Sequence, residues 1–273
     1  MNIIQSIVPY LPKPVQNWKE KRYYGRYGEI ELHLLEFLCD RERDAIDVGA
    51  NNGCYVHFMR PHSKRVIGFE PYPPFIRMLT DKFRGKAVIE PIALSNSVGE
   101  TVLRVPVENG KDVTGCSTID AMASSFYTDW REIKVTMDKL DNVYKGNVGF
   151  IKIDVEGHEY AVLEGAIETI RRCQPRVLVE LVEHLGDGCI AKACEFFSRL
   201  SYRGFYVHNG ALHPISTFNI REMQNPMNMP DLHASLKERP RFPKYIYNFI
   251  FLPWNEPIRT IEQMDERLER MFS

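Results

Sequence analysis

A glycine-containing turn is the first feature whose residue types and spacing could do chemistry. It begins at the end of the apolar segment 45–48 and reads Asp47-Val48-Gly49-Ala50-Asn51-Asn52-Gly53. A chain that passes abruptly from a strand into a helix beneath a ligand needs glycine where the backbone comes close or takes a positive φ. Asn51 replaces the second glycine of a dinucleotide-binding turn, and no Lys-Ser or Lys-Thr follows as in a phosphate-binding loop. The turn therefore predicts a ligand that presents no phosphates there.

A second acidic residue, Glu70, ends the next strand pattern, 23 residues after Asp47. A carboxylate at that position can accept both hydroxyl hydrogens of a ribose. The carboxylate of Asp47 could bind a cationic amino group of the same ligand. A ribose without a pyrophosphate and with a cationic amino group fits S-adenosylmethionine. The alternative interpretation is an ordinary turn followed by a strand-end glutamate, with no ligand.

A second group of acidic residues follows the apolar segment 148–155. Asp154 and Glu156 come at its carboxyl end, where open α/β sheets bind ligands, and Gly157 and His158 begin a helical pattern. Glu156 could cap that helix, and for Glu159 capping is the better interpretation, because carboxylates are favoured near helix N-termini. Asp154 needs a partner such as a hydroxyl, an amine or a metal, because it ends a buried strand.

The next strand pattern ends with a histidine, in Glu180-Leu181-Val182-Glu183-His184. Histidine is a natural general base near neutral pH, so His184 is the first candidate base and His158 is its rival. Each could equally be an ordinary surface histidine. Asp154, Glu180 and His184 could also gather a divalent metal such as Mg²⁺, because such ions prefer oxygen-rich sites. This pattern is compatible with a metal but does not require one.

Short β-branched segments alternate with helical patterns along the chain, as in βαβ units. This alternation predicts an α/β fold with a largely parallel sheet that would align the acidic residues at one edge. The expected strands are 45–48, 65–69, 87–89, 148–155, 176–182, 205–208 and 245–252, and the expected helices are 73–83, 158–172 and 190–200. Asn209-Gly210 predicts a tight hairpin.

We expect one catalytic domain over residues 44–255. A leader and one helix, with an apolar stripe over 29–38, precede it in 1–43, and a surface helix follows in 256–273. Within the domain, segment 108–130 predicts an irregular insertion, and the prolines of 214–243 exclude a long helix there.

Aromatic residues in the insertion are candidates for a carbohydrate platform or lid, namely Phe126, Tyr127 and Trp130. The tyrosines of segment 21–27 are better explained by a packed amphipathic leader. The aromatic patches could serve either a homodimer or a lid.

The composition excludes several classes of protein. The chain has 273 residues, 35 Lys and Arg against 36 Asp and Glu, and a net charge of −1, so we expect no nucleic-acid partner. Its six cysteines form no C-x-x-C pair, which predicts reduced thiols and a cytoplasmic location. No apolar run approaches the ~18 residues of a membrane span.

The motifs together resemble the FkbM family of S-adenosylmethionine-dependent methyltransferases over about residues 44–253. They are DVGANNG (47–53), GFEP (68–71), ALS (93–95), VTMDKL (135–140), IKIDVEGHE (151–159), LEGA (163–166) and NFIFLP (248–253). The resemblance implies a class I methyltransferase Rossmann-like fold: a mostly parallel seven-stranded sheet with an antiparallel last strand and helices on both faces. It also implies O-methylation, often of a sugar hydroxyl in a bacterial polysaccharide, glycolipid or secondary metabolite.

These considerations assign residues to roles. We expect S-adenosylmethionine to be held by Asp47, Gly49, Ala50, Asn51, Gly53, Glu70 and Pro71, with Ala93 and Leu94 near its adenine. We expect Asp154 and Glu156 to line the methyl end, and His184 or His158 to take a proton from a small-molecule or glycan acceptor. Two other functions stay open. One is a non-catalytic nucleoside-binding protein with a decayed site, and the other is an NAD-dependent enzyme, which Asn51 disfavours.

Overall fold

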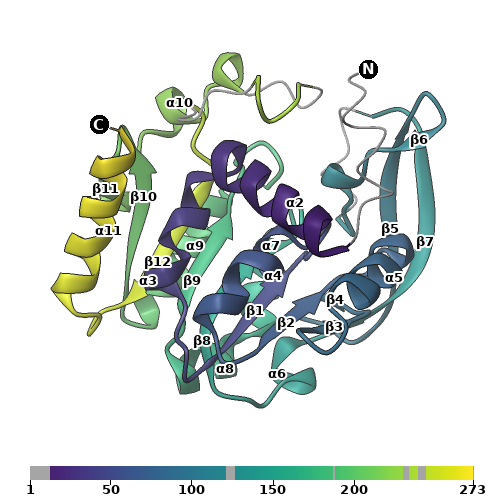
Figure 1. The fold of residues 1–273 in the computed structure, drawn as a ribbon, viewed down its shortest axis with the longest axis horizontal. Coiled ribbons are helices and arrows are strands. Elements are labelled where there is room, and N and C mark those ends of the chain that lie inside the picture. Colours follow the sequence, from purple (N-terminus) through teal and green to yellow (C-terminus); the bar gives the residue numbers. More distant parts are fainter. Residues whose placement is uncertain (1–12, 121–126, 187, 230–233, 239–243, 273) are drawn as a thin grey trace.

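The computed structural model describes residues 13–120, 127–186, 188–229, 234–238 and 244–272. Its main sheet has eight strands in the order β11-β10-β12-β9-β8-β1-β2-β3 (Figure 1). In chain order these strands are β1 (Asp44–Val48), β2 (Val66–Phe69), β3 (Val88–Glu90), β8 (Val148–Ile153), β9 (Arg176–Glu180), β10 (Tyr202–His208), β11 (Ala211–Pro214) and β12 (Asn248–Pro253).

The strand order is that of a class I methyltransferase Rossmann-like fold. Strands β3, β2, β1, β8 and β9 are parallel, whereas β12 runs antiparallel between β9 and β10, as predicted for the last strand. The sheet has one strand more than the predicted seven. The extra strand, β11, pairs with β10 through a hairpin in which Asn209 and Gly210 both have positive φ, 46° and 79°. Those two residues therefore form the predicted turn.

Helices cover both faces of the sheet because successive strand residues point to opposite sides (Figure 1). Ile151 packs into one core with α6 (Leu140–Val143), α7 (Glu159–Gly165), α8 (Ile167–Cys173) and α9 (Cys189–Arg199). Its neighbour Phe150 packs into the other with η2 (Ile30–Leu34), α3 (Leu35–Leu38), α4 (Cys54–Met59), α5 (Pro73–Lys82) and α11 (Ile258–Phe272). The predicted C-terminal helix is α11.

The helix predicted over 158–172 is divided at Ala166 into α7 and α8. Gly165 lies against the backbone of Ser95, where an added Cβ would be 1.9 Å from the Ser95 oxygen. The carboxylate of Asp141 accepts the backbone N–H groups of Glu168 and Thr169, which open α8. The break thus brings the helix close to the loop after β4 (Ala93–Leu94). The first N–H groups of the second helix are satisfied by the side chain of Asp141.

The insertion is larger and more regular than predicted. Strands β5 (Gly99–Glu108) and β7 (Trp130–Asp138) form a long antiparallel hairpin beside α5 (Figure 1), and β4 and β6 (Lys111–Asp112) complete a second sheet. Its apolar side packs on Tyr72 and Phe75. The Nε1 of Trp130 donates to the Tyr127 carbonyl oxygen (3.2 Å). Phe126 lies outside the described residues.

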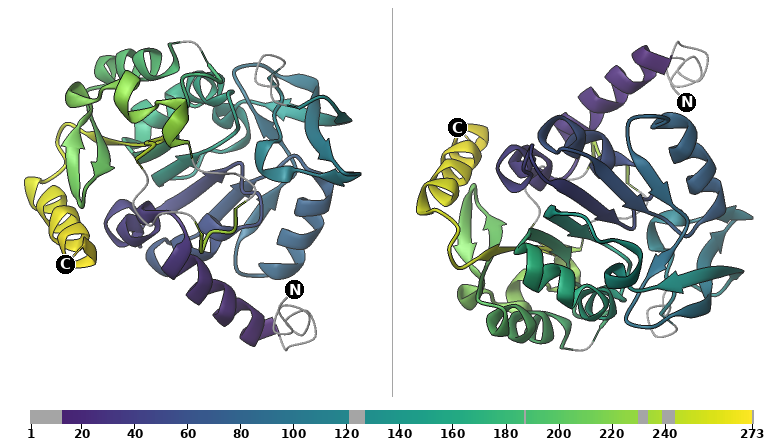
Figure 2. Two further views of the ribbon diagram at one scale, coloured as in Figure 1. Left: turned by 90° about the horizontal axis from the view of Figure 1, so that it is seen from above. Right: turned by 90° about the horizontal axis from the view of Figure 1, so that it is seen from below.

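The N-terminal segment contains a helix that the sequence patterns did not indicate, α2 (Lys13–Tyr27). Its N-terminal end is the part furthest from the sheet (Figure 2). The helix predicted over 29–38 is instead the short turn η2 followed by α3. Asn52 Nδ2 donates to the Tyr24 hydroxyl (2.9 Å), and Lys82 Nζ contacts both Glu20 Oε1 (2.6 Å) and the Asn52 carbonyl (3.0 Å). These contacts attach α2 to the glycine turn.

Segment 214–243 contains no long helix in its described part, as the prolines predicted. It holds only the short elements η5 (Ile215–Thr217), α10 (Ile220–Met223) and η6 (Pro226–Asn228). Buried Gln224 joins this segment to the end of β9 and the start of β12, because its amide donates to the carbonyls of Leu181 (2.7 Å) and Ile246 (2.9 Å). Among the described residues, no helix combines the length and apolar character needed to cross a membrane.

Candidate active site

The glycine turn brings the ends of β1 and β8 into backbone contact. Gly49 has φ +79°, and a Cβ there would lie 1.8 Å from the carbonyl oxygen of Asp154. Only glycine allows this approach. Gly53 also has φ +79°, but a Cβ on it would meet Phe83 and Leu79 at 2.5 and 2.6 Å. Gly53 therefore serves the packing of α4 on α5, and it does not line either of the two pockets described below.

Glu70 lies at the carboxyl end of β2, as predicted, and only 5% of its surface is exposed. Its carboxylate accepts backbone N–H groups from Asn51 (2.7 Å) and Tyr72 (2.8 Å). Burial raises the pKa of Glu70 to about 7 in spite of these two hydrogen bonds. The side chain thus joins the glycine turn to the end of β2, and its carboxylate faces a small pocket.

This small pocket contains the residues predicted to hold adenosine. It is lined by Glu70, Pro71, Ala93, Leu94, Tyr72, Phe75, Ile92, Leu103, Ile119 and parts of both strand-end loops. Apolar walls beside the Glu70 carboxylate suit a base and a ribose. Sequence reasoning did not find Leu103 and Ile119, because they come from the insertion.

Asp47 lies at the end of β1 and is the most completely buried acidic residue near the turn, with 1% of its surface exposed. Neither of its carboxylate oxygens has a well-formed hydrogen bond to another described residue, although the nearby backbone N–H of Val56 favours the charged form and lowers the pKa. Burial raises its pKa to about 7, although Lys152, its neighbour in the β1–β8 register, favours the charged form. A buried carboxylate without a partner is costly, so Asp47 is prepared for a ligand that donates hydrogen bonds.

Lys152, on β8, is a further residue of the site. Its Nζ lies 2.6 Å from Asp154 Oδ2, and the two side chains are 5% and 26% exposed. The same ammonium lies 4.8 Å from the centre of the Tyr55 ring. Burial would lower the pKa of Lys152, but the carboxylates of Asp154 and Asp47 raise it above its usual value. Lys152 is therefore a fixed positive charge at the centre of the site.

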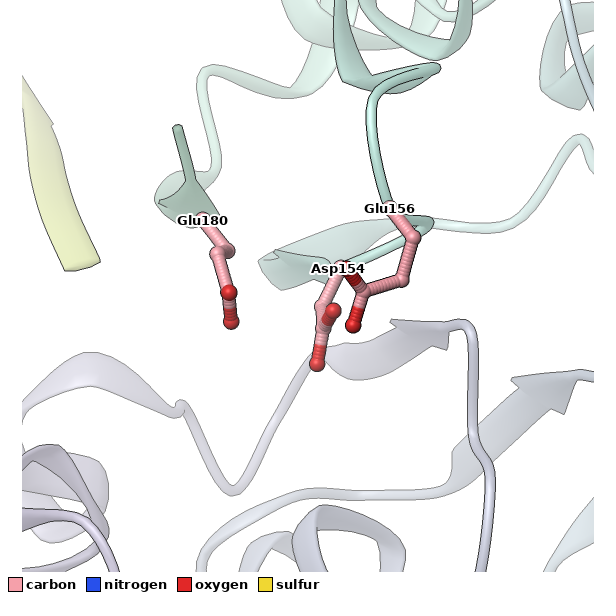
Figure 3. Close-up of side chains that lie close together, drawn as sticks. All are labelled: Asp154, Glu156 and Glu180. Carbon is pink, nitrogen blue, oxygen red and sulfur yellow. The ribbon is translucent and has the colours of Figure 1, made fainter. Parts of the chain in front are cut away.

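Three carboxylates converge beyond this ion pair, from the ends of β8 and β9 (Figure 3). One oxygen each of Asp154, Glu156 and Glu180 lie within 4.8 Å of one another. Burial, and then the charge of Asp154, raise the pKa of both Glu156 and Glu180 well above the usual value. Such a group can share a proton or hold a hard cation. His184, the third ligand proposed from the sequence, is not part of it.

The two candidate histidines lie beside this cluster. His158 Nε2 is 2.9 Å from the Ser95 hydroxyl, and its Nδ1 is 4.0 Å from Asp120. His184 Nδ1 is 3.3 Å from the Tyr245 hydroxyl. Burial lowers the pKa of both histidines, so each is neutral near pH 7. Neither lines the two pockets, as far as the described residues define them.

Glu159 shapes the loop that carries Glu156. It is buried, and its Oε1 accepts the backbone N–H groups of Val155 (3.1 Å) and Gly157 (3.0 Å). Both N–H groups belong to the loop before α7, so Glu159 stabilises that loop and does not cap the helix as predicted. Glu156 itself has φ +55°, a conformation uncommon for a side chain of this kind. Glu159 therefore holds the turn that directs Glu156 toward Asp154.

A larger pocket, of about 220 Å³, lies on the other side of Asp47 and Asp154. Sequence reasoning missed most of its walls, which include Tyr24, Tyr27, Glu29, Glu31, Tyr55, Tyr245, Tyr247 and Asn248. The sequence signal that could have indicated this pocket is the pair of acidic residues Glu29 and Glu31 at the start of an apolar stripe. Gly49, Asn51 and Asp154 line both pockets. Asp154 is thus at the junction of the small pocket and the larger one.

The comparison with protein families agrees with this arrangement. Residues 47–203, more than half of the chain, match the family model of the methyltransferase FkbM domain. The chain belongs to the FkbM methyltransferase family. The matched region contains the glycine turn, Glu70, Lys152 and the three converging carboxylates, whereas much of the wall of the larger pocket lies outside it. A search of curated proteins finds no match.

Solved methyltransferase structures are similar to this FkbM-family chain, at low identity. The FkbM methyltransferase of Methylobacillus flagellatus has 13% identity and a TM-score of 0.48, over 78% of this chain and 44% of that chain. This chain therefore spans less than half the length of that relative. A putative methyltransferase of Streptococcus mutans in complex with S-adenosylhomocysteine has 11% identity and a TM-score of 0.38, over 82% and 96% of the two chains. A TehB-like methyltransferase of Corynebacterium glutamicum has 11% identity and a TM-score of 0.42, over 88% and 95%.

Proposed function

We propose that this FkbM-family protein transfers a methyl group from S-adenosylmethionine to a hydroxyl group of a sugar, in a bacterial glycan, glycolipid or secondary metabolite. The observation that supports this most directly is the position of Asp154. It lies where the small pocket, suited to adenosine, meets the larger polar pocket. A donor and an acceptor held in the two pockets would meet there, and alignment of the two is the main requirement of methyl transfer.

The residues present fit S-adenosylmethionine. In the proposal, Glu70 accepts the ribose hydroxyls, Ala93 and Leu94 border the adenine, and Asp47 accepts the amino group. The two unpartnered oxygens of Asp47 support the last assignment, because a cationic donor would satisfy them. When bound, the cofactor supplies a methyl group already activated on a sulfonium.

The protein's own contribution would be orientation and removal of a proton. We place the proton acceptor among Asp154, Glu156 and Glu180, since the raised pKa values of the two glutamates suit a shared proton. Lys152 holds Asp154 in position. His158 and His184 are the alternative bases.

Isothermal titration calorimetry with S-adenosylhomocysteine tests the cofactor part of the proposal. We expect a dissociation constant of about 1–100 μM. Absence of binding, with and without added Mg²⁺, would contradict the assignment. Binding that appears only with Mg²⁺ would instead favour a metal at the three carboxylates.

Transfer of labelled methyl groups to a panel of glycans tests the acceptor part. With an active acceptor, D154N should reduce turnover by about a hundredfold or more, the usual contribution of a positioned base. Retention of full activity by D154N, with loss in H184A or H158A, would move the base to a histidine. Tight S-adenosylhomocysteine binding without methyl uptake by any acceptor would favour a non-catalytic nucleoside-binding protein.

A further inference from the structure

The larger pocket has a charge pattern that selects the acceptor. We infer that the group entering it is a neutral or amino sugar without a negative charge, and that Glu29, Glu31 and Asn248 make this selection. The inference rests on the proposed function, because it assigns this pocket to the acceptor. It concerns the sign of charge that the pocket accepts.

The ionisable groups that line the pocket are predominantly acidic. Its described lining residues include four carboxylates, Asp47, Asp154, Glu29 and Glu31, and one lysine, Lys152. That lysine is already paired with Asp154 at 2.6 Å. Lining His208 adds no charge near pH 7, because burial lowers its pKa. A phosphate or carboxylate entering the pocket would lose its hydration without gaining a free cation in return.

The polar groups form a connected and fixed arrangement. Tyr55 donates its hydroxyl hydrogen to Glu29 Oε2 (2.6 Å), and Asn248 Nδ2 donates to Glu29 Oε2 (3.1 Å) and to Glu31 Oε2 (3.2 Å). Both carboxylates therefore share one neutral amide donor. Each retains lone pairs that can accept hydrogen bonds from hydroxyl or ammonium groups.

Glu31 shows that this end of the pocket lacks a positive partner. It is 6% exposed, and burial together with the nearby charge of Glu29 raises its pKa to about 8. An ammonium group bound beside Glu31 would supply the missing charge.

Among the described residues, two exposed cations lie against the lining residue Tyr27 without lining the pocket themselves. Arg26 and Lys237 are exposed and lie 5.4 and 5.7 Å from the centre of the Tyr27 ring. They are solvated and screened, so an anion outside the pocket could be tolerated there. The selection therefore applies to the sugar that carries the reacting hydroxyl, and it does not extend to the rest of a larger acceptor.

The selecting residues come from the two ends of the chain. Glu29 and Glu31 precede the matched region 47–203, and Asn248 follows it. The catalytic residues lie inside that region. In this inference the flanking segments contribute the residues that select the acceptor, and the matched core contributes the cofactor site and part of the pocket wall.

Saturation-transfer NMR on the complex of the full chain with S-adenosylhomocysteine tests this inference. The probes are four sugars of similar size: methyl glucoside, glucosamine, methyl glucuronide and glucose 6-phosphate. We expect the first two to bind at least about tenfold more tightly than the two anionic sugars. In E31Q, the preference for glucosamine over methyl glucuronide should fall by about fivefold or more, because the substitution removes the carboxyl group that a bound ammonium would ionise and keeps the shape. E195Q, on the exposed face of α9, is the matched control and should leave the preference unchanged.

The outcomes separate this inference from the proposed function. Equal or tighter binding of the anionic sugars overturns the inference, as does an unchanged preference in E31Q. Binding of S-adenosylhomocysteine without binding of any of the four sugars also overturns it, and leaves the cofactor assignment standing. Failure of S-adenosylhomocysteine itself to bind overturns the proposed function, and the inference with it.

Discussion

The ammonium of Lys152 lies 2.6 Å from the carboxylate of Asp154, two residues later on the same chain segment. Consecutive residues of a strand alternate between its faces, so residues two apart share one face. Here that face looks toward Asp47 and the ring of Tyr55. The pair places one fixed cation among several carboxylates, and the charge state of the site depends on it.

Substitution of Lys152 by methionine should therefore destabilise the protein. It leaves Asp154 unpaired beside Glu156 and Glu180, and removal of one partner of a buried ion pair costs about 3–5 kcal/mol. We expect the lower end, because Asp154 is 26% exposed. Urea unfolding of K152M, with K152R as the charge-conserving control, measures the change. A free energy of unfolding equal to that of the wild type would show that the pair contributes no stability.

Glu70 can be tested by its effect on cofactor affinity. E70A should weaken binding of S-adenosylhomocysteine by about 1–3 kcal/mol, because the ribose hydroxyls lose a charged acceptor. Glu70 also accepts N–H groups from Asn51 and Tyr72. E70Q is therefore the better-matched variant, since it retains the side-chain shape and one acceptor oxygen. Calorimetry measures the affinity and circular dichroism checks the fold. Unchanged affinity in both variants would exclude the ribose assignment.

Asp47 should make cofactor binding pH-dependent. Burial raises its pKa from 3.8 to about 7, so the unliganded protein holds a proton there below neutral pH. A raised carboxyl pKa stabilises the folded protein at low pH, and this contribution is lost as the pH rises through about 7. A bound ammonium favours the ionised form. Affinity for S-adenosylhomocysteine should therefore increase about tenfold between about pH 6 and about pH 8, with proton release.

Two variants separate the contributions to this pH dependence. D47N should remove the part due to Asp47. E70Q should retain that part and remove the part due to Glu70, whose pKa burial also raises to about 7. Titrations in buffers of different ionisation enthalpy count the released protons. A pH-independent affinity in the wild type would contradict the role given to Asp47.

Gly49 should tolerate no side chain. Its φ is +79°, and a Cβ would lie 1.8 Å from the Asp154 carbonyl oxygen, so G49A must displace one of the two loops. We expect the free energy of unfolding to fall by more than about 2 kcal/mol, from backbone strain and this clash. G25A is the control. Gly25 lies within α2, its added Cβ would be 3.8 Å from Phe58, and Ala favours a helix by about 0.5–1 kcal/mol. Thermal unfolding of both variants measures the change. A stability of G49A equal to that of the wild type would contradict this prediction.

Local patterns predicted a large part of the fold. Buried strands, the positive-φ turn at Asn209 and Gly210, and the apolar stripe of the last helix each depend on residues near one another in sequence. The helix α2 was missed because its aromatic and basic residues show no clean apolar stripe. The hairpin of β5 and β7 was only partly found, since its pairing joins residues such as Gly99 and Met137.

The sequence by itself placed Gly49 and Glu70 directly after two neighbouring strands, which is why both meet at one sheet edge and line the small pocket. Only the tertiary structure decided the other pocket. Asn248 and Glu29 are hydrogen-bonded although 219 positions separate them, and no local pattern specifies such a contact. It also decided that Glu156, and not His184, joins Asp154 and Glu180. The physical reason is that a strand fixes the position of a residue's backbone at the sheet edge. The loops and helices that pack around the strand determine which charged groups lie next to the residue's side chain.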